Sequence, residues 1–148
     1  MNAHGLDTSF LVAHEISRHA SHRRVRSHCD QLLARGDRLV LAPQVLAELI
    51  HVVTDNRRFA APLSIGAAVE RASIWWHAEE VFPIYPGAET ARLFLDWLLQ
   101  LRLGRKRLLD TLLAATWAQA GVSQILTLNW PHFQVYGCFT TGFSEQEG

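Results

Sequence analysis

Short β-like runs alternate with longer helical segments along this chain, and this alternation constrains its fold more than any other feature. Helical patterns cover residues 22–36, 43–56, 65–78, 88–102 and the segment that begins at Asp110. The β-like runs lie at 37–43, 79–86, 124–129 and 138–143, with a very short one before Asp7. Strands that alternate with helices form parallel sheets covered on both faces. We therefore predict a single domain over residues 1–148, a three-layer α/β/α fold with a central, mostly parallel sheet.

The start of the chain is the weakest part of this pattern. Asn2, His4 and Gly5 interrupt the apolar sequence before Leu6, and they make residues 1–5 poor strand material. We therefore expect only a very short first strand, running directly into a helix.

The composition restricts the class of protein. Hydrophobic residues make up 49% of the 148 residues, which is enough for a core and argues against disorder. The net charge is zero, so it favours neither binding nor exclusion of nucleic acid. Cys29 and Cys138 form no C-x-x-C pair, and no apolar run is long enough to cross a bilayer. With no secretory segment at the start, we expect a reduced, cytoplasmic protein without membrane contact.

Four polar side chains fall where a parallel sheet would gather them. The carboxyl ends of parallel strands and the N-termini of the following helices share one edge, where ligands bind. Asp7 and Asn129 follow strands, and Asp110 begins a helix. Glu48 lies about one turn into the helix that leaves the same edge. We therefore expect these four side chains to lie close together.

Three carboxylates at one edge point to a divalent cation. Without Lys or Arg between them they repel, and raised pKa values or a cation must relieve the repulsion. Hard oxygen ligands suit Mg²⁺ or Mn²⁺, which activate water and stabilise charge on a phosphate. The chemistry that this arrangement favours is phosphodiester hydrolysis.

Each of these residues also has an ordinary structural interpretation. Asp7 and Asp110 are good helix N-caps. Glu48 borders an apolar helix face, and Asn129 is a common turn residue. The prediction of a metal site therefore rests on the joint placement of the four and on none of them alone.

Four segments, in this order, resemble a known family. They are LDTSFLV, APQVLAELIHVVTD, LLDTLLAATWAQAG and ILTLNWPHF, and with them the chain from about Leu6 to Phe143 is similar to a PIN domain of the VapC toxin type. The resemblance implies a PIN-like α/β/α fold of Rossmann-like topology. It also implies an endoribonuclease that needs Mg²⁺ or Mn²⁺, is held inactive by a VapB-like antitoxin and forms a homodimer.

The resemblance also assigns roles to residues. The acidic positions of the family fall on Asp7, Glu48 and Asp110, which would bind the metal, and its T-x-D/N position falls on Thr127 and Asn129. Asn129 replaces a fourth acid and would hydrogen-bond a water or a neighbouring carboxylate. The hydroxyl groups expected to support the ligands are those of Thr8, Ser9 and Thr127.

A second departure from the family pattern is a histidine, His132, where an aspartate often precedes the phenylalanine. His132 would orient water, contact RNA or simply occupy a surface turn. For RNA binding we favour the basic run that leads to Asp110, namely Arg102, Arg105, Lys106 and Arg107.

Other functions remain open at this stage. With one acid missing, the chain could be a catalytically weakened RNA- or protein-binding module. A PIN nuclease of RNA maturation, outside a toxin–antitoxin system, would carry the same acids. His19 and His22 share a helical spacing, but no further Cys or His follows at a zinc-site spacing.

Overall fold

The computed structural model describes residues 2–143 and shows a parallel sheet of four strands in the order β3-β2-β1-β4. The strands are β1 (Ala3–Leu6), β2 (Arg38–Leu41), β3 (Val81–Pro83) and β4 (Gln124–Leu126). β1 pairs with β2 and with β4, and β2 also pairs with β3. All three pairings are parallel, so the predicted α/β/α class with a parallel central sheet is confirmed.

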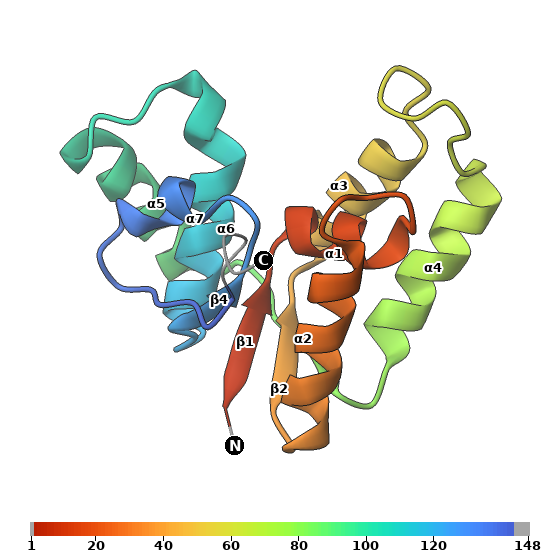
Figure 1. Cartoon of the computed structure of the whole chain (residues 1–148). Coiled ribbons are helices and arrows are strands. Elements are labelled where there is room, and N and C mark those ends of the chain that lie inside the picture. The colour runs from red at the N-terminus through yellow and green to blue at the C-terminus, as the bar shows by residue number, and fades with distance from the viewer. Residues whose placement is uncertain (1, 144–148) are drawn as a thin grey trace.

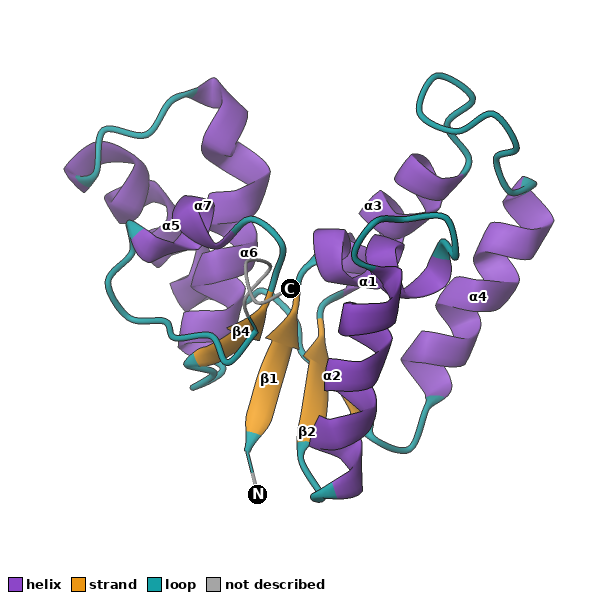
Figure 2. Cartoon of the chain, viewed as in Figure 1, coloured by secondary structure: helices purple, strands orange, loops and turns teal. Residues whose placement is uncertain are grey.

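The helices lie on both sides of this sheet (Figures 1 and 2). They are α1 (Thr8–Glu15), α2 (His22–Ala34), α3 (Pro43–Val53), α4 (Ile65–His77), α5 (Ala88–Gln100), α6 (Leu108–Gln119) and α7 (Trp130–Gln134), with a 3₁₀ turn, η1 (Arg105–Arg107), before α6. The chain moves from β1 to β2 to β3 in one direction and then returns to place β4 on the other side of β1. Right-handed connections consequently place α1 to α4 on one face and α5 and α6 on the other.

The reversal of strand order falls between β1 and β4. In sheets of this type a crevice opens at the carboxyl ends of the strands where the order reverses. Asp7 directly follows β1, and its backbone N–H donates to the carbonyl of Leu126 at the end of β4 with an N···O distance of 3.0 Å. The topology therefore selects one edge of the sheet for a site.

The first strand begins earlier than the sequence suggested, because its unfavourable residues have specific partners. His4 is buried, and its Nε2 lies 2.9 Å from Oδ2 of Asp37, the residue before β2. Asp37 also accepts the backbone N–H of Asn2 and the Nε–H of Arg35, at 3.1 and 2.8 Å. These contacts join the starts of β1 and β2, so Ala3, His4 and Gly5 belong to the strand.

Gly5 is required by a neighbouring side chain. A Cβ atom at this position would lie 2.6 Å from Nε1 of Trp117, a fully buried residue of α6. The missing side chain of Gly5 thus lets the indole ring lie directly against β1.

Apart from β1, the strands are shorter than the β-like runs predicted, and the runs at 79–86 and 138–143 differ most. The run at 79–86 contributes only Val81–Pro83. The run at 138–143 is not a strand, because it makes a single parallel bridge, between Thr140 and Gln124. Its aromatic residues instead join the core, where Phe139 packs on Trp117 and Phe143 on Phe10.

Within residues 2–143, no helix combines the length and the apolar character that crossing a bilayer requires.

Replacing Gly5 with alanine should destabilise the fold by about 1–3 kcal/mol, because the added methyl group overlaps the indole of Trp117. Urea denaturation of the two proteins measures the difference. Gly66→Ala is the matched control, since a Cβ at this position in α4 meets no atom within 4 Å and alanine favours helix. Equal losses of stability in both variants would contradict this packing argument.

Candidate metal and nuclease site

Four predicted residues line one cavity at the carboxyl edge of the sheet. The cavity has a volume of about 450 Å³. Asp7 follows β1, Glu48 lies in the middle of α3, Asp110 is in the first turn of α6, and Asn129 directly precedes α7. The structure thus brings together side chains that are separated by up to 122 positions in the chain.

Asp7 is held by two hydroxyl groups. Ser9 Oγ and Thr127 Oγ1 each donate to Asp7 Oδ2 over 2.7 Å. The same two hydroxyl oxygens accept backbone N–H groups, from Leu128 and Asn129 respectively, both at 2.9 Å. Because these N–H groups can only donate, each hydroxyl hydrogen is directed to the carboxylate. The arrangement ties the residues after β4 to the residue after β1.

The environment of Asp7 disfavours its negative charge. Burial raises the pKa of this carboxyl group, and the nearby charge of Asp110 adds to the effect. The hydrogen bonds from Thr127 and Ser9 and from the backbone of Thr8 act in the opposite direction, and the resulting pKa is about 6. The fold therefore places a carboxylate in a position where a cation would stabilise it.

A hydrogen bond from a residue of α1 orients Glu48. Thr8, at the start of α1, donates its hydroxyl hydrogen to Glu48 Oε2 over 3.1 Å. Each of the three residues expected to support the acids, Thr8, Ser9 and Thr127, therefore hydrogen-bonds one of them.

Asp110 interacts with two basic residues of its own surroundings. Its Oδ2 lies 3.3 Å from Nδ1 of His132 and 3.8 Å from Nε of Arg107. Arg107 also donates to the backbone carbonyl of His132. The histidine that departs from the family pattern is thus a contact of the third acid.

The donor set fits a hard divalent cation in kind, since it consists of carboxylate, amide and hydroxyl oxygens at one cavity. The side chains do not yet converge: within residues 2–143, no three His, Cys, Asp or Glu residues are close enough to hold an ion together. Asp110 is drawn toward His132 and Arg107, and Glu48 is bonded to Thr8. A cation would have to compete with these partners.

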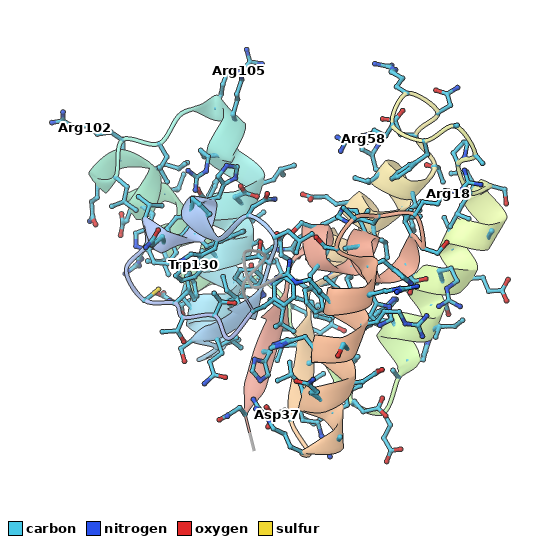
Figure 3. The ribbon with its side chains drawn as sticks, in the orientation of Figure 1. Arg18, Asp37, Arg58, Arg102, Arg105 and Trp130 are labelled. Atoms are coloured by element: carbon cyan, nitrogen blue, oxygen red, sulfur yellow. The ribbon has the colours of Figure 1, made fainter. Side chains whose placement is uncertain are left out.

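The basic residues expected to bind RNA fall into two groups. Arg102 and Arg105 extend outward from the arm formed by the end of α5 and the start of α6 (Figure 3), and Lys106 is also exposed. Arg107 is different, because its guanidinium is engaged with His132 and Asp110. Three of the four are therefore accessible to a phosphate backbone.

Sequence reasoning did not place two polar residues at the acidic cavity, His19 and Arg58. Both belong to loops, where no periodicity predicts which side chain faces a cavity. The zinc interpretation of His19 and His22 has no support among the described residues, because their Nδ1 atoms contact the Ser21 N–H and the Ala13 carbonyl.

Comparison with known proteins identifies relatives of this architecture. The PIN domain family model matches residues 6–136. VapC20 of Mycobacterium tuberculosis, a toxin that cleaves the sarcin–ricin loop, is 21% identical with a TM-score of 0.68, over 90% of this chain and 95% of that one. VapBC-1 from nontypeable Haemophilus influenzae is 20% identical with a TM-score of 0.66, over 94% and 96%. A search of curated protein sequences finds no match.

A third similar structure is VapBC2 from Rickettsia felis, bound to a DNA fragment from its promoter. It is 16% identical with a TM-score of 0.67, over 94% of this chain and 96% of that chain. At these identities the three structures establish a shared fold.

Replacing Asp7 with asparagine should stabilise the metal-free protein at neutral pH. The carboxyl pKa is raised from 3.8 to about 6, so the wild type should lose about 3 kcal/mol of stability, relative to the variant, as the pH rises across that interval. Asparagine keeps an oxygen for Ser9 and Thr127 but carries no charge. Denaturation of both proteins in EDTA at several pH values between 4 and 7 measures the difference.

The same pair of proteins tests the cation. Mn²⁺ should restore stability to the wild type at pH 7 and have little effect on Asp7→Asn. Parallel pH profiles for the two proteins would show that the charge of Asp7 is not disfavoured by the fold.

Proposed function

This chain belongs to the PIN domain family, and we propose that it is a divalent-metal-dependent endoribonuclease, the toxin of a VapBC-type toxin–antitoxin pair. The observation that carries the proposal is the meeting of Asp7, Glu48, Asp110 and Asn129 at one cavity. The likeness in fold to VapC20, a toxin that cleaves the sarcin–ricin loop, supports the choice of RNA as substrate.

In the proposed mechanism, Asp7, Glu48 and Asp110 would hold Mg²⁺ or Mn²⁺. The ion would supply a more acidic water and stabilise negative charge on the phosphate. Ser9 and Thr127 keep the carboxylate of Asp7 in one orientation. Glu48, oriented by Thr8, also lies at the cavity and can accept a proton from the attacking water.

Three further residues complete the proposed chemistry. Asn129 donates its amide N–H to a neighbouring carboxylate or a water at the edge of the cavity. His132 and Arg107 contact Asp110 at the edge of the cavity, where the Arg107 guanidinium and the His132 ring would be placed to contact a phosphate.

The proposal includes partners. The structures of VapBC-1 and VapBC2 support a VapB-like antitoxin as the protein that neutralises this chain. Exposed leucines on the α5–α6 side, Leu95, Leu99 and Leu109, provide an apolar surface for a homodimer or for the antitoxin. Trp75 of α4 is not part of such a surface, because it is buried and donates its Nε1–H to Glu15.

The second candidate function is a catalytically weakened module that binds RNA or protein. Asn129 in place of an acid and the engagement of Asp110 by His132 and Arg107 favour it. Calorimetric titration with Mn²⁺ separates the two, because the module need not bind the ion.

The decisive experiment is expression of the wild type beside Asp7→Asn and Asp110→Asn, with sequencing of the RNA 5′ ends that appear in the cell. The wild type should produce new ends at defined sites, and each variant should lower cleavage of a purified RNA roughly 100-fold or more, because each removes a metal ligand. Excess EDTA should abolish the wild-type activity.

Asp96→Asn is the matched control, since Asp96 is an exposed acid of α5 that does not line the cavity. It should leave cleavage unchanged. Full activity of Asp7→Asn or Asp110→Asn, or of the wild type in excess EDTA, would refute the proposed chemistry.

A further inference from the structure

The acidic cavity adjoins a second cavity, of about 410 Å³, on the side of α1 and of the loop after α3. His19 lines both and stands between them. A volume of this size is within the roughly 300–1,000 Å³ of small-molecule binding sites. A ligand bound in the acidic cavity can therefore extend into the second cavity.

The second cavity has an apolar wall and a basic rim. Ile16, Phe59 and Leu63 line it while packing on the core, and each remains partly exposed. Arg18 lines it as well and is exposed. An apolar wall that includes an aromatic ring, with a cation beside it, suits a flat group attached to an anionic chain.

The loop that carries Phe59 is held in one shape by Asp55. The Asp55 carboxylate accepts the backbone N–H of Arg57 at 2.9 Å and pairs with Arg58 at 3.4 Å. The Asp55 carbonyl accepts the N–H of Phe59 at 3.1 Å. The ring therefore does not depend on a ligand for its position.

Glu15 lines this cavity, but its negative charge is compensated and does not prevent an anion from binding. Burial would raise the pKa of Glu15, but hydrogen bonds from His14, Arg71 and Trp75 outweigh it and lower the pKa to about 2. Arg71 bonds both carboxylate oxygens, at 2.7 and 3.2 Å. The charge of Glu15 is thus compensated by an arginine.

His19 and Arg58 stand where the two cavities meet or beside that point. The N–H of Ser21 donates to Nδ1 of His19 over 3.0 Å, so the proton of the neutral ring is on Nε2 and is available as a donor. Arg58 lines the acidic cavity, and Figure 3 shows it on the same side of the molecule as Arg18. Both residues therefore supply N–H donors near the junction of the two cavities, and Arg58 is at the same time paired with Asp55.

We propose that the second cavity binds the nucleobase of a nucleotide next to the scissile phosphate of single-stranded RNA, stacked on Phe59. His19 and Arg58 hold the connecting phosphate, and Arg18 contacts the strand beyond it. The proposal rests on the proposed ribonuclease function, and it makes this cavity a determinant of where the RNA is cut.

The test uses a single-stranded RNA oligonucleotide that spans a mapped cleavage site, and two copies that each lack one base beside the cut. The wild type should cleave one of the abasic copies about tenfold more slowly than the intact RNA. Phe59→Leu should cleave the intact and abasic RNAs at the same lowered rate, because it keeps the apolar packing and loses the stacking surface. Phe59→Trp should retain the tenfold difference.

Arg58→Gln and His19→Gln should raise the KM of intact and abasic RNA alike, with a smaller effect on kcat. Each removes a side chain that contacts the phosphate and leaves the base site unchanged. Phe82→Leu is the matched aromatic control, and Arg92→Gln is the matched charge control, since both residues are exposed on other elements. Neither should alter the preference for the intact RNA.

Cleavage by the wild type without a penalty for either missing base would overturn the nucleobase site and leave the ribonuclease standing. The nucleobase site would also be overturned if Phe59→Leu kept the full penalty for the missing base. If this variant instead weakened neutralisation by an antitoxin and left the base preference intact, the cavity would be a peptide-binding site. Absence of RNA cleavage by the wild type with Mg²⁺ and with Mn²⁺ would instead reject the proposed function, and the nucleobase site with it.

Discussion

The structure of the site depends on one buried carboxylate and the two hydroxyl groups that hold it. Asp7 receives hydrogen bonds from Ser9 and Thr127, and these hydroxyls are themselves fixed by the backbone of the segment after β4. The same few bonds set the orientation of the acid and join the ends of two adjacent parallel strands. Loss of either hydroxyl would leave a buried charge with fewer donors, which is costly in a protein interior.

The remaining acids are arranged so that the metal-free site limits their mutual repulsion. Asp110 turns toward His132 and Arg107, and Glu48 accepts a hydroxyl from Thr8. Asp7 has no cationic partner of this kind among its described contacts, and its pKa rises to about 6. A cation at this site would have to replace existing contacts, so its affinity would depend on how readily Asp110 leaves His132 and Arg107.

The position of the acids was predictable because it follows from the geometry of parallel sheets. Asp7, Asp110 and Asn129 each stand at a strand end or a helix start, and such positions share one edge whatever the loops do. Other features depend on contacts between distant residues and escaped prediction. His4 and Gly5 belong to a strand only because Asp37 and Trp117 lie beside them, and nothing periodic places His19 and Arg58 at the cavity.

The close contact between Gly5 and Trp117 also bears on chemistry. Gly5 stands two positions before Asp7, and Trp117 is two helical turns after Asp110 on the same helix. Because Gly5 has no side chain, α6 can pack close to β1. Gly5 thereby influences the distance between the carboxylates of Asp7 and Asp110, although it contacts neither. A side chain introduced at Gly5, near the carboxyl end of β1, would push α6 away from the strand and alter the geometry of the site two residues further along.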